Sequence, residues 1–214
     1  MSKFVFVDME TGNLHSLENA FKRIGVEIVR ATSPTDVADA SVVVLPGVGA
    51  FGKAMEVLRE KDLIDPLRQI VLTKRKPLLG ICLGMQLLAE NSNEHGFHNG
   101  LGLLKGSVRK LEPTTPEFRV PNIGWYDVNV EDTKELFVNE GTIRSYYFVH
   151  SYHLVCDDPN DVAGAINYGG EKVTAAIEKN NVFGLQFHPE KSQGAGLDLL
   201  NNFLKYMRKM GYVF

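Results

Sequence analysis

Short apolar runs alternate with segments of helical periodicity through the first half of the chain. Residues 4–7 form the first apolar run, and the positions at helical spacing after it are Leu14, Leu17, Ala20, Phe21 and Ile24. Further apolar runs lie at 26–29, 41–45 and 78–81, and a largely helical segment at 55–71. Fully apolar strands separated by helices predict a parallel sheet with helices on both faces.

The second half of the chain is richer in strands. Its expected strands lie at 107–111, 125–130, 145–149, 162–166, 173–177 and 182–187. These segments predict a mixed or antiparallel region, and the helical spacing of apolar positions between 197 and 207 predicts a final helix packed on the sheet. The expected fold class is α/β, with a mixed, mostly parallel central sheet flanked by helices.

Composition and charge narrow the class of protein. The chain has 214 residues, of which 44% are apolar, so we expect one compact domain spanning residues 1–214. A net charge of -3, from 23 basic and 26 acidic residues, provides no basic face for nucleic acid. Charges at Lys3 and Asp8 argue against a signal peptide, and no apolar stretch approaches the ~18 residues of a membrane span. We therefore expect a soluble, cytoplasmic protein.

The cysteines and histidines predict neither disulfides nor a metal site. Cys82 and Cys156 are too few for a disulfide framework, and both are expected to be reduced. The six histidines occur without a Cys-x-x-Cys or His-Glu-x-x-His spacing. No metal and no cofactor are expected.

Cys82 lies between an apolar strand and a helical segment, with Gly80 and Gly84 two residues away on either side. This pattern is typical of a nucleophile elbow, in which a sharp turn needs small neighbours and presents the side chain at the edge of the sheet. The start of the following helix is expected to favour a thiolate. The alternative interpretation is a small buried cysteine.

His188 ends another strand, and Glu190 follows it across Pro189. A thiol nucleophile needs a base that takes its proton and returns it to the leaving amine, and a carboxylate can orient that base. A surface turn is the alternative for His-Pro-Glu alone, but pairing with the Cys82 elbow favours catalysis.

A glycine-rich turn at 46–51 follows the strand expected at 41–45. Gly47 and Gly49 free the backbone to aim N–H groups at the oxyanion of a tetrahedral intermediate. A phosphate-binding turn is the alternative, although the Gly-Lys-Ser/Thr of a Walker sequence is absent.

Together, Pro46-Gly47-Val48-Gly49, Gly80 to Gln86 and Phe187 to Glu190 resemble the class I (triad) glutamine amidotransferases. Gly12-Asn13-Leu14, Pro121 to Trp125, Tyr147 to Tyr152 and His188-Pro189-Glu190-Lys191-Ser192 extend the likeness over the whole chain. Within the class, the chain is most similar to the glutaminase subunits that supply ammonia in histidine biosynthesis.

The resemblance implies an α/β glutaminase fold and a role for each matched residue. Cys82 would be the nucleophile, His188 the acid and base, and Glu190 its orienter, while the N–H groups of Val48 and Leu83 would form the oxyanion hole. The substrate L-glutamine would be held by Gly49, Gln86, Glu94, His150, Ser151 and Tyr152.

The resemblance also implies a heterodimer with a (β/α)8-barrel cyclase or synthase subunit, through which ammonia travels. Its interface would include Asn13, Trp125, Tyr147 and Lys191. The family usually has Asp-Tyr-Gly-x-Gly-Asn where this chain has residues 8–13, and Pro-His-Met-Gly-Trp-Asn where it has 121–126. A paralogous subunit that supplies ammonia for amidino sugars of surface polysaccharides is therefore an alternative.

Two other classes of function were weighed. A cysteine peptidase could use the same elbow, but Gln86 and the His-Pro-Glu ending argue against it. A regulatory module without catalysis would have lost one of Cys82, His188 and Glu190, and all three are present.

Three features are assigned no catalytic or nucleic-acid-binding role. His15 is interpreted as a surface residue, Cys156 as a bystander in a turn, and the basic run 74–76 as a solvated helix end. His150 is the second choice for the base, and its context favours support of the glutamine site.

Overall fold

The computed structural model describes residues 3–10, 14–130, 134–138 and 143–213. The strands are β1 (Phe4–Val7), β2 (Ile28–Ala31), β3 (Val42–Gly47), β4 (Leu78–Cys82), β5 (Asn91–Ser92), β6 (His98–Asn99), β7 (Gly106–Lys110), β8 (Asn122–Val130), β9 (Ile143–His150), β10 (Tyr152–Cys156), β11 (Val162–Tyr168), β12 (Glu171–Lys179) and β13 (Val182–Leu185). The α-helices are α1 (Leu14–Arg23), α2 (Pro34–Ala38), α3 (Phe51–Glu60), α4 (Ile64–Arg68), α5 (Leu83–Gln86) and α6 (Gln193–Lys209). Shorter turns are the π-helical η1 (Gln69–Thr73) and the 3-10 turns η2 (Glu135–Phe137), η3 (Pro159–Asp161) and η4 (Pro189–Lys191).

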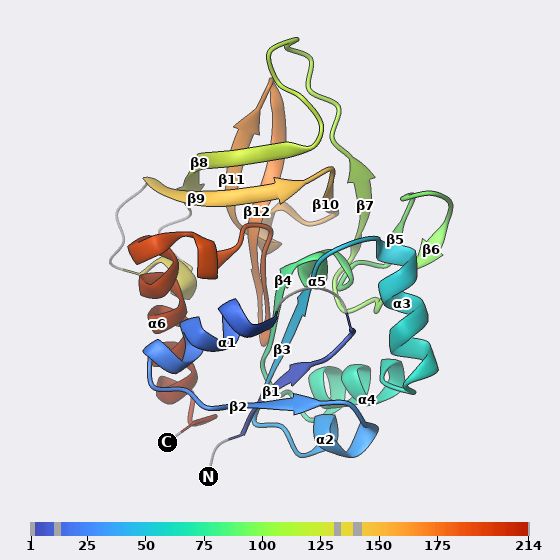
Figure 1. Cartoon of the computed structure of the whole chain (residues 1–214), viewed down its shortest axis with the longest axis vertical. Helices are drawn as coiled ribbons and strands as arrows, with labels where there is room; N and C mark the ends of the chain where they lie inside the picture. Colours follow the sequence, from blue (N-terminus) through green and yellow to red (C-terminus); the bar gives the residue numbers. More distant parts are fainter. Residues whose placement is uncertain (1–2, 11–13, 131–133, 139–142, 214) are drawn as a thin grey trace.

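The main sheet joins the two halves of the chain. Within the described ranges its strand order is β2-β1-β3-β4-β13-β12-β11-β8-β9 (Figure 1). The pairs from β2 to β13 are parallel, and the pairs from β13 to β9 are antiparallel. A smaller sheet has the order β10-β7-β5-β6. The expected mixed sheet is confirmed, and its parallel part is the half that carries Cys82.

Alternate residues of the parallel strands enter separate cores on the two faces of the sheet. Phe4 and Phe6 of β1 pack with α1 and α6, whereas Val5 and Val7 pack with α3 and α4. Figure 1 shows these two pairs of helices on opposite sides of β1, β3 and β4. The alternation follows from the two-residue period of a strand, and covering both faces explains why these runs are wholly apolar.

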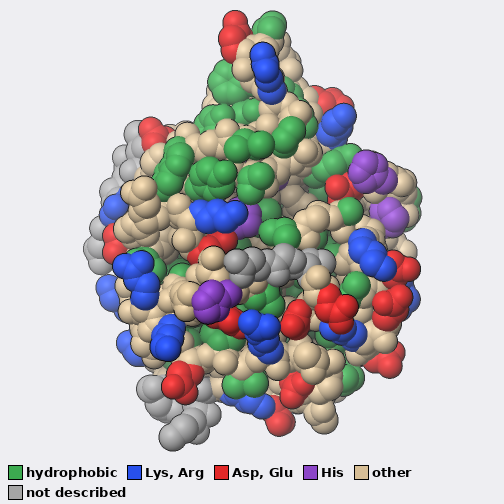
Figure 2. Space-filling model, in the orientation of Figure 1, with side chains coloured by type: hydrophobic (Ala, Val, Ile, Leu, Met, Phe, Trp, Pro, Cys, Tyr) green, Lys and Arg blue, Asp and Glu red, His purple; other side chains and the backbone are tan. Residues whose placement is uncertain are grey.

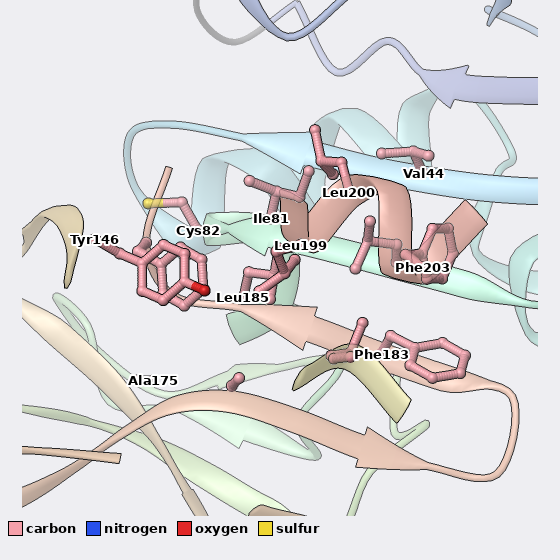
Figure 3. Close-up of a cluster of buried hydrophobic side chains, with 14 of the residues drawn as sticks. Val44, Ile81, Cys82, Tyr146, Ala175, Phe183, Leu185, Leu199, Leu200 and Phe203 are labelled. Carbon is pink, nitrogen blue, oxygen red and sulfur yellow. The ribbon is translucent and has the colours of Figure 1, made fainter. Parts of the chain in front are cut away.

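The core on the α6 side ends directly at the candidate nucleophile. Figure 3 shows Leu199, Leu200 and Phe203 of α6 beside Ile81 and Leu185, with the Cys82 sulfur at the edge of the cluster. The rings of Tyr146 and Phe187 stack there at a centroid distance of 4.0 Å. Cys82 therefore packs against a dense part of the hydrophobic core.

Several expected boundaries are wrong. The helix expected at 55–71 is divided into α3, α4 and η1, because Asp62 has φ +55° and a left-handed residue cannot continue a right-handed helix. The strand expected at 26–29 begins at Ile28, since the Val26 N–H closes the end of α1 on the Phe21 carbonyl. The strand expected at 182–187 ends at Leu185.

Several elements were not expected from the sequence. The helix α2 begins with a reciprocal cap between Ser33 and Asp36. Three strands of the small sheet, β5, β6 and β10, were also not expected, and β10 lies antiparallel to β7. No helix in the described ranges is long and apolar enough to cross a membrane.

Candidate active site

Cys82 lies at the sharp turn from β4 into α5. Its φ of 54° and ψ of -109° are unusual for a residue with a side chain, as expected for a nucleophile elbow. A Cβ on Gly84 would come 1.7 Å from the Leu45 carbonyl oxygen, and one on Gly80 would come 2.7 Å from the Gly84 oxygen. The flanking glycines are therefore required by close approach of the backbone.

The helix after Cys82 is shorter than the sequence suggests. α5 spans only Leu83–Gln86, which is about one turn. A single turn contributes little macrodipole, so the expectation that the start of this helix favours a thiolate has little support from its length.

His188 and Glu190 follow β13, the strand that pairs with β4 on the side opposite β3. Their backbone follows β13 into η4, and the His188 N–H donates to the Tyr147 carbonyl at 2.9 Å. The Nδ1 of His188 lies 2.8 Å from Oε1 of Glu190, and both side chains are buried. Because a carboxylate only accepts, this contact places a proton on Nδ1 and leaves Nε2 for proton exchange.

The charges around His188 favour its protonated form. Burial lowers the pKa of His188, but hydrogen bonding and attraction from Cys82 and Glu190 outweigh this and raise the pKa to about 10. An imidazolium beside a cysteine is the arrangement of an activated thiolate pair.

A pocket of about 330 Å³ opens beside Cys82. Ten of the predicted site residues line it: Val48, Gly49, Cys82, Leu83, Gln86, Glu94, His150, Ser151, Tyr152 and His188. Pro121 and Val149 also line it and were not predicted. Glu190 does not line this pocket, and it lines a smaller cavity together with His188, Leu14 and Leu17.

His150 is held by hydrogen bonds on both ring nitrogens. Its Nδ1 lies 2.9 Å from the Tyr152 carbonyl oxygen, and its Nε2 lies 3.1 Å from Nδ2 of Asn122. Burial lowers the pKa of His150 to about 4. It is therefore a neutral ring with a fixed tautomer, which fits support of the pocket and excludes the second choice of base.

The glycine-rich loop is anchored at both ends. Gly47 packs against Met9, whose Cε would lie 2.8 Å from a Cβ at position 47, and Gly49 has φ +101°. At the far end, the Phe51 N–H at the start of α3 donates to Glu94 at 2.6 Å. Glu94 therefore connects the pocket wall to the loop that carries Val48 and Gly49.

Comparisons with known proteins agree with this geometry. The family described as glutamine amidotransferase class-I matches residues 5–207. The chain belongs to this family. The catalytic trio of cysteine, histidine and glutamate is typical of these enzymes, and the chain is a class-I glutamine amidotransferase.

Two relatives that match over nearly their full length carry the same subunit name. The imidazole glycerol phosphate synthase subunit HisH 2 of Nitrobacter winogradskyi is 41% identical over 96% of this chain and 99% of its own length. The imidazole glycerol phosphate synthase subunit HisH of Sulfurimonas denitrificans is 47% identical over 94% of this chain and 96% of its own length.

Solved structures confirm the fold. A structure titled PurLQS from Thermotoga maritima has a TM-score of 0.74 at 21% identity, covering 96% of this chain and 99% of that one. A crystal structure titled glutamine amidotransferase has a TM-score of 0.72 at 18% identity, covering 98% and 99%. At these identities the likeness concerns the α/β architecture of the amidotransferase.

Three of the residues predicted for an interface, Trp125, Tyr147 and Lys191, do not line the pocket. Trp125 of β8 and Tyr147 of β9 are paired across the strands, with ring centroids 6.0 Å apart. The Lys191 Nζ lies 5.8 Å from the centre of the Tyr147 ring. The fourth residue, Asn13, lies outside the described residues.

The remaining candidates stay outside the chemistry of the amidotransferase. Burial raises the pKa of Cys156 to about 12, with Asp161 acting in the same direction, so its thiol stays protonated. The Lys74 ammonium donates to the Ala38 carbonyl. In the described ranges, no three His, Cys, Asp or Glu side chains gather as metal ligands would.

The sequence reasoning missed two buried carboxamides. Asn122 pairs with His150, and Gln186 lies with its Nε2 3.8 Å from the Cys82 sulfur. Gln186 could have been found from strand register, because Leu185 pairs with Ile81 and the next residues are Gln186 and Cys82.

Proposed function

We propose that this chain is the glutaminase subunit of imidazole glycerol phosphate synthase and acts in the cytoplasm in histidine biosynthesis. It hydrolyses L-glutamine to glutamate and ammonia, and passes the ammonia to a synthase partner. The observation that carries the proposal is full-length similarity at 41–47% identity to subunits of that synthase. The pocket beside Cys82 supports it, because Cys82 and His188, the two side chains that would react with glutamine, both line this one cavity.

The proposed reaction begins with the Cys82 thiolate and the His188 imidazolium. Sulfur attacks the amide carbon of glutamine, and the oxyanion accepts hydrogen bonds from the N–H groups of Val48 and Leu83. His188 gives its proton to the amide nitrogen, the carbon–nitrogen bond breaks, and ammonia leaves. His188 then takes a proton from water, whose oxygen attacks the thioester and releases glutamate and the Cys82 thiolate.

The α-amino and carboxylate ends of glutamine would be held on the opposite wall. Both N–H groups of the Gln86 amide are donated to protein oxygens, at 2.8 Å to Tyr152 and 3.0 Å to Gln186. Its carbonyl oxygen is therefore the atom suited to a ligand, and it would accept from the α-ammonium beside Glu94. Gly49, Ser151 and Tyr152 would complete this wall around the carboxylate end, with His150 as support.

A surface beside the pocket suits a partner subunit. Trp125 is 45% exposed and Ile123 is 57% exposed, although both are large and apolar. Figure 2 shows hydrophobic side chains gathered over the region where Figure 1 places β8 and β9. Exposed apolar patches mark interaction sites, and tryptophan and tyrosine are typical interface anchors. We propose that a (β/α)8-barrel cyclase docks here in a heterodimer, with Asn13 and Lys191 at the same interface.

Glutamate release from glutamine tests the proposal. The full chain is assayed alone and with a histidine-pathway cyclase subunit plus its nucleotide substrate, with Cys82→Ala as the control. Stimulation by the cyclase that is lost in Cys82→Ala is the expected result. Full activity of Cys82→Ala in the complex would exclude Cys82 as the nucleophile.

The same assay separates the two candidate pathways. If the cyclase gives no stimulation while a glutamine-analogue electrophile still labels Cys82, the chain is a glutaminase with another partner. The amidino-sugar pathway of surface polysaccharides is then the assignment to test.

A further inference from the structure

Gln186 is a fully buried polar residue beside the candidate nucleophile, and the proposed reaction gives it no role. Its side chain has 0% exposure, and its Nε2 lies 3.8 Å from the Cys82 sulfur. Its backbone N–H is donated to the Ala175 carbonyl at 2.8 Å, so the residue is fixed at the end of β13. A buried carboxamide is costly unless its groups are paired, so its contacts indicate what it does.

The direction of the Gln186 amide is set by a main-chain oxygen. The Tyr152 carbonyl can only accept, so the Gln86 atom 2.8 Å from it must be the amide nitrogen. The second N–H of that nitrogen then points to Gln186 at 3.0 Å, which must present its oxygen there. The nitrogen of Gln186 therefore faces the Cys82 sulfur.

Two protein groups within 4 Å of the sulfur suit different protonation states of Cys82. The Val149 carbonyl oxygen lies 3.9 Å from the sulfur and only accepts, so it suits the neutral thiol as donor. The Gln186 N–H only donates, so it suits the thiolate. With α5 limited to one turn, such a donor has more to contribute than it would beside a long helix.

We propose that Gln186 is a further catalytic residue, which donates a carboxamide N–H to the Cys82 thiolate in a direction fixed by Gln86 and the Tyr152 carbonyl. The inference rests on the proposed function, because it takes Cys82 as the nucleophile. Before attack, the side-chain N–H of Gln186 donates to the Cys82 thiolate. The same N–H donates to the sulfur again in deacylation, when the carbon–sulfur bond breaks and its electron pair returns to Cys82.

Alkylation of Cys82 by iodoacetamide tests this role without glutamine. The parent is the full chain with Cys156→Ser, and the rate of Cys82 modification is followed by mass spectrometry from pH 5 to 10. Gln186→Met keeps the length of the side chain and removes the donor. We expect the midpoint of the profile to rise by about one pH unit, with alkylation slower by roughly tenfold at pH 6.

Gln186→Glu is the second variant, and it replaces the donor with a group of nearly the same shape that repels a thiolate. We expect a larger rise in the midpoint than for Gln186→Met. Asn181→Ala is the matched control, because Asn181 is also a buried carboxamide and donates to the Val71 and Lys76 carbonyls far from the pocket. It should lower the melting temperature and leave the profile unchanged.

The outcomes separate this inference from the proposed function. If both Gln186 variants melt like the parent and keep its alkylation profile, Gln186 is not a thiolate donor, and the glutaminase proposal stands. A matching shift in Asn181→Ala would also overturn the inference, since the shift would then follow stability. Loss of the proposed function would instead appear as glutamine turnover by Cys82→Ala.

Discussion

The floor and the rim of the pocket beside Cys82 differ in burial and in hydrogen bonding. The floor (Cys82, Gln86 and His150) is buried together with Gln186, and these side chains contact one another or main-chain oxygens at fixed distances. The rim (Val48, Gly49 and Ala50) is exposed, and Val48 is 39% accessible. The folded chain by itself therefore fixes the hydrogen-bond directions of the floor side chains and keeps His150 neutral near pH 7. Val48, one of the two proposed oxyanion donors, lies on the exposed rim, whereas Leu83, the other proposed donor, is buried beside Cys82.

The largest expected effect on glutamine turnover comes from Glu190→Gln, which changes the buried support of His188. The amide can donate to Nδ1 of His188 and so favour the wrong tautomer, and the pKa of His188 falls without the carboxylate. We expect glutamine turnover by the complex to fall on the order of a thousandfold. Steady-state kinetics against Glu190→Asp, which keeps a carboxylate, measures the effect. Equal activity of the amide and acid variants would show that Glu190 does not orient the base.

The second prediction uses pH to separate the two histidines. The pKa of His150 is about 4 in the folded chain and near 6.5 when unfolded, so stability is full above pH 6.5 and is lost as pH falls toward 4. That loss amounts to about 3 kcal/mol in free energy of unfolding. Urea denaturation between pH 4 and 7 measures it, and His150→Gln should flatten the slope.

The opposite slope is expected for His188. Its folded pKa of about 10 means that its stabilising contribution is present below pH 6.5 and is lost as pH rises from 6.5 to 10. Denaturation above pH 7 should therefore respond to His188→Gln and not to His150→Gln. The reverse pattern would contradict the assigned charges.

Trp125→Ala tests whether the rim and its neighbouring surface act through a partner. Loss of a central aromatic anchor is expected to weaken binding of the cyclase by about 2 kcal/mol, or roughly thirtyfold in Kd. Basal glutamine turnover of the isolated chain should not change, because Trp125 does not line the pocket. Calorimetric titration and the basal assay measure the two quantities, with Phe97→Ala as a control for an exposed aromatic that also lies outside the pocket.

The smallest effect is expected from Ala50→Ser. Ala50 occupies the N-cap of α3 and makes no side-chain cap there, whereas a serine oxygen can accept from the first turn. The melting temperature should rise by a few degrees, equivalent to about 1 kcal/mol. If the rim must move, turnover should fall in this more stable variant, and an unchanged kcat would argue against such movement.

Sequence patterns predicted the parts of the site that local backbone chemistry determines. Gly80 and Gly84 indicated the elbow because a tight turn brings backbone atoms close to both positions and leaves no room for a side chain. The apolar strands indicated a sheet covered on both faces. The proximity of Cys82 and His188 could be predicted because each motif follows a strand of the same parallel region, and parallel strands end at the same edge of the sheet.

The contacts missed from sequence depend on partners far along the chain. Gln186 meets Gln86 across 100 residues, and Asn122 meets His150 across 28. Asn122 was noted only as a departure from the usual family residue. Its role became visible once the antiparallel pairing of β8 and β9 placed it opposite His150. The extent of α5 could not be predicted either, since the helical spacing that marks longer helices has no meaning over one turn.

The Tyr152 carbonyl oxygen receives hydrogen bonds from both Gln86 and His150. Because this acceptor belongs to the main chain, every amino acid at position 152 supplies it. The side chain there is consequently free to diversify toward different ligands, while the hydrogen-bond polarity beneath the nucleophile is inherited unchanged.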